Sequence, residues 1–390
     1  MSIIDVMRNK HLGIVVLVAV VSLLLFWAPF KLKIPNLLGV AFEGAGMERI
    51  ISNFDGLNFL IVAKTNYDPV LIEQNYQDVL SGRRPLYFSA HYPGLPILIK
   101  AFDTVMSGPN AVLFAILTSN ILLALGLFWF FDWYTKDSKM AMWLSILALF
   151  LPGRMLATRG VGSNEMLFIF FVLGSLLFHE RGKKWMAALM GSLAVLTRSP
   201  GILLFGAYLV QFTIYNLQFT KTIKDFFAQL RCFLPYLLIP LSLVGLWIYY
   251  GITFGSFWAY FQVGGNINLY YPFAVFASNM PWVGDIWTED IIYLTMFMVG
   301  GTYLYIKRKG WGAISLFAII YAVFTLSVAH RDIARYSLPL APIMIAGWSE
   351  IIPTKLGKWI GCVLVIPVFL YSWQFVLANY QVVMDWTKYL

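Results

Sequence analysis

The sequence predicts an all-α, polytopic integral membrane protein with about eleven transmembrane helices. Three observations support this fold class. Of the 390 residues, 60% are hydrophobic and 12% are charged, whereas a soluble globular protein carries about 25% charged residues. The apolar residues form continuous runs, not the alternating pattern of a transmembrane β-barrel. Lys and Arg gather in the short loops between these runs, which is typical of cytoplasmic loops.

A helix needs about 20 apolar residues to cross the bilayer. The predicted spans are the apolar runs whose length is close to this value. The run after Arg8 and Lys10 lacks a small-residue cleavage site, so we expect a retained first span and not a signal peptide. Runs as short as 139–153 and 185–197 require a helix embedded in a bundle. In chain order the predicted spans are 12–30, 110–132, 139–153, 164–179, 185–197, 200–217, 232–250, 291–306, 311–328, 336–352 and 358–377.

Composition also limits the function. Hydrophobic runs fill most of the chain, so 1–390 is predicted to form a single transmembrane domain, which excludes a soluble enzyme. The net charge of +9 lies largely in short loops, so no nucleic-acid partner is predicted. The two cysteines and four histidines follow no disulfide or metal-ligand spacing. No metal site is therefore predicted.

The basic loops predict the orientation of the chain. With the N-terminus inside, every short Lys/Arg-rich loop falls on the cytoplasmic side. The extracytoplasmic face then receives a long outer segment, an outer loop and three short turns. These are 31–109, 251–290, 154–163, the turn at Arg198, and 329–335. Polar residues concentrate on this outer face, which would be that of the cell membrane in a prokaryote or the ER lumen in a eukaryote.

The outer segment 31–109 is too polar at its start to span a membrane. Apolar residues at helical spacing over 49–64 predict one amphipathic helix lying on the membrane surface. Asp68 followed by Pro69 predicts a second helix start, with Asp as the N-cap, and this helix should end near Gly82. The apolar stretch 93–105 is too short to cross. The outer loop 251–290 is rich in Tyr, Trp and Asn; it either caps a cavity and stacks on sugar or forms an interfacial aromatic belt.

Asp55 is the first candidate for chemistry. It lies in Asn-Phe-Asp-Gly-Leu-Asn-Phe at 53–59, flanked by aromatic residues on the predicted interfacial helix. One interpretation is a solvated surface carboxylate. The other is a general base held at the membrane surface. His91 opens a second cluster, His-Tyr-Pro-Gly-Leu-Pro at 91–96, which by itself is a turn before an interfacial helix.

Four further polar residues lie at the predicted outer turns. Arg154, Arg159 and Glu165 flank the mouth of the span at 164–179, and Arg198 lies in a tight turn before Ser-Pro-Gly. They are either substrate-binding groups or ordinary features of a membrane interface. An interfacial Arg can, for instance, simply satisfy the carbonyl groups of a helix end.

Arg331 and Arg335 are the candidate phosphate ligands. They precede a predicted span that begins near Tyr336 and presents its N-terminus to the outer face. Helix N-termini favour anions, and Arg binds phosphate through two donors at once. Alternatively, Asp332 forms a salt bridge with one of the two arginines and merely fixes the loop.

The order of these motifs resembles the membrane glycosyltransferases of the C fold, in particular the GPI mannosyltransferase type II family and its prokaryotic relatives. Asn stands at position 66 where Gly is usual, and 91–96 keeps the two prolines of that family's Phe-Phe-Pro-Leu-Tyr-Pro motif. The motifs that carry the resemblance are Phe54-Asp55-Gly56 through Asn66-Tyr67, His91 to Pro96, Ser163-Asn164-Glu165, Arg198-Ser199-Pro200-Gly201 and Arg335-Tyr336-Ser337-Leu338-Pro339.

The resemblance implies a polyprenyl-phosphate sugar donor, with mannose as the sugar, and an acidic base on the first outer segment, here Asp55. His91, Arg154, Arg159, Glu165, Arg198, Arg331, Arg335 and Tyr336 are then the expected substrate-binding residues. The acceptor would be a glycolipid or glycan, and a single displacement would invert the anomeric centre. No cofactor is implied. A divalent metal is not required in principle, because Arg can neutralise the phosphate leaving group.

Three other functions remain open on the sequence alone. A lipid or polysaccharide transporter would need ionisable residues near the midpoints of its spans. A polysaccharide polymerase would have Arg-rich outer loops without the early Asp-Gly segment. A non-catalytic membrane partner subunit with a catalytic ancestry would have a sequence of this kind. Neither the oligomeric state nor the identity of the acceptor follows from the sequence.

Overall fold

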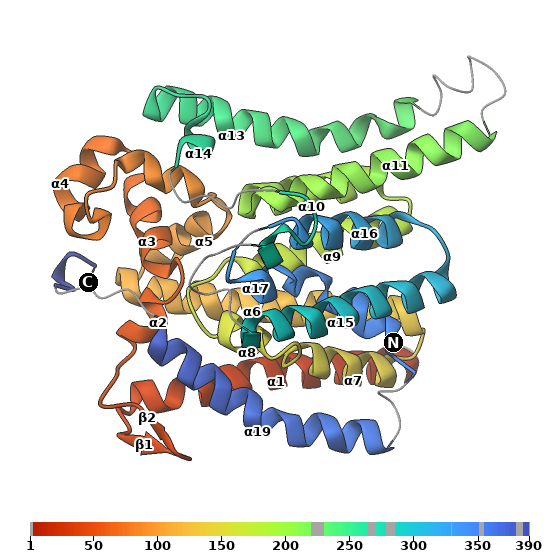
Figure 1. The fold of residues 1–390 in the computed structure, drawn as a ribbon, viewed down its shortest axis with the longest axis horizontal. Helices are drawn as coiled ribbons and strands as arrows, with labels where there is room; N and C mark the ends of the chain where they lie inside the picture. The colour runs from red at the N-terminus through yellow and green to blue at the C-terminus, as the bar shows by residue number, and fades with distance from the viewer. Residues whose placement is uncertain are drawn as a thin grey trace.

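The computed structural model describes residues 3–219, 230–263, 270–277, 285–328, 330–350, 355–379 and 385–389. The protein is all-α, as predicted (Figure 1). Within these ranges the only strands form a small antiparallel hairpin of β1 (Asn36–Leu37) and β2 (Val40–Ala41). Most long helices run roughly along one direction, with the outer segment α2–α5 gathered at one end of the bundle.

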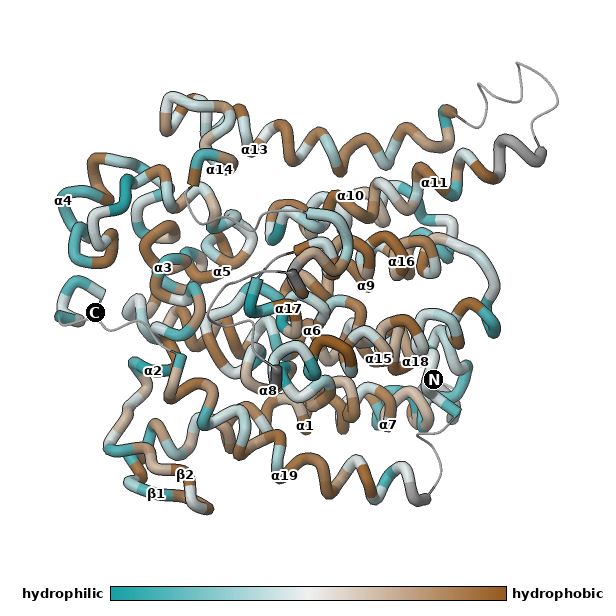
Figure 2. Tube along the Cα trace, in the orientation of Figure 1, coloured by the Kyte–Doolittle hydropathy of each residue, from teal (hydrophilic) through white to brown (hydrophobic). Residues whose placement is uncertain are grey.

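Four helical segments of the described chain are long and apolar enough to cross a membrane, by length and composition. They are Val6–Lys31, Gly108–Thr135, Leu230–Phe254 and Gly357–Ala378. They correspond to α1 (Ile3–Lys31), α6 (Gly108–Thr135), α13 (Leu238–Phe254) with the turn before it, and α19 (Lys355–Ala378). Each coincides with a predicted span. Figure 2 shows hydrophobic residues along these helices, whereas hydrophilic residues gather at α4 and α17.

The other predicted spans are also helical, but several of these helices are short. With a rise of 1.5 Å per residue, a 14-residue helix such as α10 is about 21 Å long, against a hydrocarbon core of about 30 Å. The count of eleven crossings therefore stays a prediction. These helices are α7 (Ser138–Ala148), α9 (Glu165–Glu180), α10 (Lys184–Thr197), α11 (Ile202–Phe219), α15 (Asp285–Lys309) and α16 (Ala313–Leu326).

The span predicted at 336–352 is not one continuous helix. It divides into α17 (Ile333–Tyr336), the 3₁₀ turn η5 (Leu338–Leu340) and α18 (Ala341–Gly347). Pro339 lies in the break, where a residue without an N–H interrupts a helix least. The helical stretch begins at Ile333, three residues before the predicted start near Tyr336, and it is broken after α17.

The outer segment is folded into short packed helices. The single amphipathic helix predicted over 49–64 is wrong. The chain breaks at Phe54, whose φ is +50°, and the ten-residue α3 that follows is buried on nearly every side. The helix predicted after Asp68 is confirmed, because the Asp68 side chain accepts hydrogen bonds from the Val70 and Leu71 N–H groups. The segment comprises α2 (Glu48–Ser52), α3 (Gly56–Thr65), α4 (Pro69–Leu80), η1 (Pro85–Ala90) and α5 (Gly94–Asp103).

Short elements complete the fold. α6 contacts α1, α5, α7 and α9, so it lies at the centre of the core. α8 (Arg154–Arg159) packs against α17 and α19. The remaining short elements are η2 (Ser199–Gly201), η3 (Leu234–Leu237), α14 (Ala259–Gln262), η4 (Ala274–Ala277) and η6 (Thr387–Tyr389). In the outer loop 251–290, residues 264–269 and 278–284 lie outside the described residues, so its predicted capping role has no structural description there.

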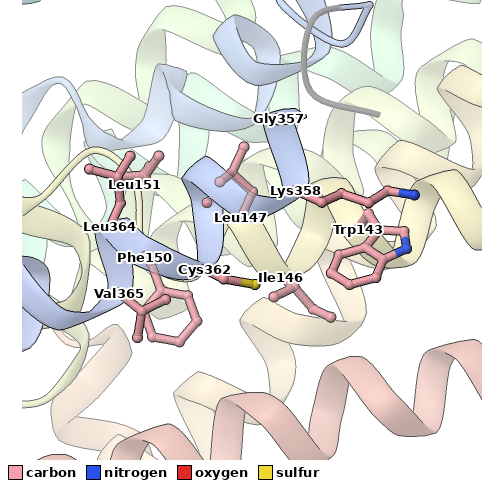
Figure 3. A pocket seen from close by; sticks show the side chains of 11 residues that line it. Trp143, Ile146, Leu147, Phe150, Leu151, Gly357, Lys358, Cys362, Leu364 and Val365 are labelled. Atoms are coloured by element: carbon pink, nitrogen blue, oxygen red, sulfur yellow. The ribbon is translucent and has the colours of Figure 1, made fainter. Parts of the chain in front are cut away.

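A pocket between α7 and α19 is almost entirely apolar (Figure 3). Its one charged group is the Lys358 ammonium, 5.1 Å from the centroid of the Trp143 ring. The pocket offers no carboxylate, imidazole or hydroxyl for chemistry. The lining residues are Trp143, Ile146, Leu147, Phe150, Leu151, Gly357, Lys358, Gly361, Cys362, Leu364 and Val365.

Candidate functional site

Asp55 stands at the N-cap of α3, directly after the strained Phe54. A positive φ is rare for an aromatic residue and persists only where the surrounding structure enforces it. Close backbone packing enforces it here: a Cβ on Gly56 would lie 2.1 Å from the Ile51 carbonyl oxygen, and one on Gly162 would lie 2.4 Å from the Gly56 Cα. The two glycines thus let the Asp55 loop lie against the segment that leads into α9.

A fully buried carboxylate organises the arginines of the site. Glu165, the first residue of α9, accepts a hydrogen bond on Oε1 from Arg335 Nε at 2.5 Å and another from Arg198 Nη1. Arg335 Nη2 also lies 3.4 Å from Asp55 Oδ2, so Arg335 bridges the two carboxylates. Glu165 was expected to bind substrate, but its complete burial makes it a residue that positions Arg198 and Arg335.

His91 flanks Asp55 on the other side. Its Nε2 lies 3.5 Å from Asp55 Oδ1, and its ring centroid is 5.1 Å from that of Tyr87 and 5.5 Å from that of Phe59. Gly94 makes this placement possible, because a Cβ there would lie 2.3 Å from the hydroxyl of Thr197 at the end of α10. We call Asp55, His91, Glu165, Arg198 and Arg335 the Asp55 cluster.

Electrostatics keep the exposed acid of the cluster ionised. Burial raises the pKa of Asp55, but a hydrogen bond and charge from His91 and the charges of Arg335 and Arg198 outweigh it, so the pKa lies well below its usual range. Burial lowers the pKa of Arg335, but the charges of Glu165 and Asp55 raise it by more than burial lowers it. The guanidinium therefore stays protonated. The Asp55 side chain keeps 35% of its surface exposed, so it is accessible from solvent.

Aromatic rings line the two arginines. The Arg335 Cζ is 4.0 Å from the centroid of the Phe54 ring, and the Arg198 Cζ is 5.5 Å from that of Tyr336. Such cation–π contacts fix the plane of a guanidinium. Tyr336 therefore lies beside the cluster as predicted from the Arg-Tyr-x-Leu-Pro motif, but as the last residue of α17. Its N–H donates to the Asp332 carbonyl at 3.0 Å, so it is paired within α17, and the N-terminus of this helix lies at Ile333.

Asp332 does not pair with either of the arginines expected for it. Among the described residues its carboxylate pairs with Arg154 Nη1, at 3.7 Å. Arg154 lies on α8, its Cζ is 3.9 Å from the centroid of the Phe375 ring, and its buried Nε has no hydrogen-bond partner in the described chain. Arg154 is therefore near α17 but is not a member of the Asp55 cluster.

Two predicted site residues lie elsewhere. Arg159 is completely buried and donates four hydrogen bonds to neutral groups, so no face of it is open to a substrate. Arg331 is exposed, and its Nη2 lies 3.5 Å from Asn379 Oδ1. The structure brings neither of them to the Asp55 cluster.

The C-terminal end of α19 closes onto the Asp55 loop. Asn53 Nδ2 donates to the Val376 carbonyl at 2.8 Å, and Asn379 Nδ2 donates to Asn53 Oδ1 at 3.0 Å. The Phe375 and Phe54 rings are 5.6 Å apart between centroids. The sequence did not predict this contact, because the motif at 53–59 carries no signal for a partner more than 300 positions away.

No protein-family model matches this sequence, and no curated protein matches it. The resemblance to C-fold glycosyltransferases therefore depends on the motifs themselves. Within the described residues, no group of three or more His, Cys, Asp or Glu side chains is placed to hold a metal ion.

Proposed function

We propose that this chain is a multi-pass membrane glycosyltransferase. It transfers a sugar, mannose by the resemblance, from a polyprenyl phosphate to a lipid or glycan acceptor on the extracytoplasmic face. The observation that carries the proposal is the Asp55 cluster: a partly exposed, ionised carboxylate beside two arginines that one buried carboxylate holds in place. A base next to a fixed cationic site is what displacement of a phosphate leaving group requires.

In the proposed reaction the acceptor hydroxyl attacks the anomeric carbon while Asp55 takes its proton. The new bond joins the acceptor oxygen to that carbon, the bond from the carbon to the phosphate oxygen breaks, and polyprenyl phosphate leaves. The anomeric centre inverts in this single step. Arg198 and Arg335 stabilise the leaving phosphate, and Glu165 holds both of them.

Donor binding also explains how Asp55 becomes a useful base. Without donor, the arginine charges lower the pKa of Asp55, which makes it a weak proton acceptor. A donor phosphate that pairs with Arg198 and Arg335 offsets those charges, and a nearby anion raises the pKa of a carboxylate. The base therefore strengthens once the donor is bound.

A transfer assay tests the proposal. The purified full chain in lipid nanodiscs receives polyprenyl-phosphate mannose labelled in the sugar, together with a membrane lipid extract as acceptor. We expect label in the acceptor fraction and accumulation of polyprenyl phosphate with the wild-type protein but not with Asp55→Asn. Intact donor after prolonged incubation with wild-type protein would overturn the proposal.

The proposed orientation has a separate test. We propose about eleven spans with a cytoplasmic N-terminus, supported by the apolar helices and the basic loops. The ten-residue α5 is about 15 Å long, too short to add a crossing. A cysteine placed at Lys309 should resist a membrane-impermeant maleimide in intact cells and react after permeabilisation. Labelling in intact cells would reverse the later part of the topology.

A further inference from the structure

Asp55 lies between two different sets of side chains. On one side are Arg198 and Arg335, fixed by Glu165. On the other side is His91, whose ring contacts Tyr87. In the proposed reaction Asp55 takes a proton from the acceptor, whereas the two arginines bind the phosphate of the donor. The acceptor therefore belongs on the side of Asp55 away from the arginines, next to Tyr87.

Tyr87 extends this second side towards solvent. Its ring centroid lies 5.1 Å from that of His91, and the side chain is partly exposed. Burial raises the pKa of the Tyr87 phenol, the Asp55 charge raises it further, and the Arg83 charge lowers it. The phenol therefore lies within the electrostatic reach of both the base and this arginine.

Arg83 is a cation held in place without an anion. Its Cζ is 4.5 Å from the centroid of the Tyr87 ring, and its side chain is exposed. No carboxylate of the described chain lies within ion-pair distance of its guanidinium, whereas Arg154 and Arg198 each have one and Arg335 has two. Its guanidinium donors are therefore available to a ligand.

From this arrangement we infer that the acceptor binds along Tyr87 and His91 and that Arg83 binds a phosphate or phosphodiester carried by that acceptor. The inference rests on the proposed function, and it narrows the acceptor class to anionic, hydroxyl-bearing compounds. The face of an aromatic ring suits a sugar or polyol. A guanidinium stacked on the Tyr87 ring presents its donors to phosphate oxygens that lie near this tyrosine.

Arg84 provides a matched control. It is the next residue, carries the same charge and is also exposed. No aromatic ring of the described chain lies under its guanidinium, whereas Tyr87 lies under that of Arg83. A general attraction of anions to this surface would depend on both arginines equally, whereas a built site would depend on Arg83.

The test measures binding to the purified full chain in neutral-lipid nanodiscs without donor. The probes are mannose, mannose 6-phosphate and a short-chain phosphatidylinositol, and the proteins are wild type, Arg83→Gln and Arg84→Gln. We expect the phosphorylated probes to bind more tightly than mannose. Arg83→Gln should weaken their binding by about tenfold, near the lower end for a charge-assisted contact, and Arg84→Gln by less than about twofold.

Weaker binding of either phosphorylated probe to Arg83→Gln than to wild type supports the inference. A larger loss for phosphatidylinositol identifies a lipid headgroup as the source of the phosphate, and a larger loss for mannose 6-phosphate identifies a free sugar phosphate. Equal binding by wild type and Arg83→Gln, or equal losses in both variants, overturns it. Because no donor is present, this outcome is independent of the transfer assay. A protein that transfers sugar but binds both charged probes without Arg83 would keep the proposed function and lose this acceptor site.

Discussion

Two buried arginines of this protein have opposite surroundings. Arg159 is completely buried, and its partners are the hydroxyl of Ser22, the amide of Asn120 and two backbone carbonyl groups. Arg335 keeps 6% of its surface exposed and lies between the carboxylates of Glu165 and Asp55. Both lie in short helices, within or next to turns that the sequence predicts to be on the outer face, and both were expected to bind substrate.

The difference shows that burial alone does not identify a functional arginine. Neutral dipoles engage the guanidinium of Arg159 on every side and tie α8 to α1 and α6, so this residue supports the fold. The carboxylates around Arg335 include the partly exposed Asp55, so part of this network is open to an incoming anion. The nature of the partners and their access to solvent decide the role.

The largest expected effect is a loss of sugar transfer when Asp55, the partly exposed carboxylate beside Arg335, is replaced. Asp55→Asn should lower sugar transfer by about 10²–10⁴-fold, the usual contribution of a general base, because the amide is nearly isosteric but cannot accept the proton. Thermal stability should change little, and the comparison is made on purified protein. The control is Asp78→Asn, an exposed acid of the same outer segment that contacts Lys388. Sugar transfer by Asp55→Asn at the wild-type rate would show that Asp55 is not the base and is only a charged residue at the surface.

Loss of the buried hydrogen bonds of Arg159 should lower the stability of the protein. Arg159→Met removes the donors from a buried amide, a hydroxyl and carbonyl groups, and each unsatisfied buried group costs about 1–3 kcal/mol. A total loss of roughly 2–5 kcal/mol is expected, measured as a lower melting temperature in detergent. The transfer rate per folded molecule should be preserved. A variant that melts like wild type but fails to use the donor would place Arg159 in the site after all.

Arg335 should show a smaller effect on donor use. Arg335→Ala is a poor test, because it also leaves buried Glu165 with one partner fewer and should lower stability. Arg335→Lys keeps the charge but loses the two-donor fork. We expect it to raise the donor KM by about tenfold, within the value of a charge-assisted contact, with a near wild-type melting temperature. An unchanged donor KM would show that the fork of Arg335 does not bind the donor phosphate, which would leave Arg198 as the phosphate ligand.

The smallest effect concerns pH. The folded-state pKa of Asp55 is depressed, so its stabilising contribution is present above its unfolded pKa of about 3.9 and is lost as pH falls through the lower folded value. Between pH 5 and 8 the free protein should therefore show no Asp55 titration in kcat/KM for donor. An acid limb in this range whose midpoint shifts in Asp55→Glu would contradict the depressed pKa of Asp55.

Part of this organisation is readable from the sequence. Apolar runs located helices correctly, and Asp68-Pro69 located a helix start, because both depend on local composition and capping. The predicted sidedness put Asp55, Glu165, Arg198 and Arg335 on one face, and the structure brings their side chains into contact. Proximity of this kind follows from span order, since the ends of neighbouring helices meet.

The sequence did not distinguish Arg159 from Arg335. Their roles depend on partners far along the chain: Ser22 is 137 positions from Arg159, and Asp55 is 280 positions from Arg335. Local spacing carries no information about such pairs. The break at Phe54 was missed for a similar reason, because Gly56 and Gly162 interrupt the helical pattern through a backbone contact across the fold.

The contact between α19 and the Asp55 loop has a consequence for biosynthesis. Asn53 and Phe54 leave the ribosome long before their partners Val376, Asn379 and Phe375, which are made more than 300 residues later. The Asp55 loop therefore cannot take its final form until α19 has joined the bundle. A chain that stops before α19 would therefore contain the other helices of the bundle but leave Asn53 and Phe54 without these contacts, and we expect it to lack the proposed activity.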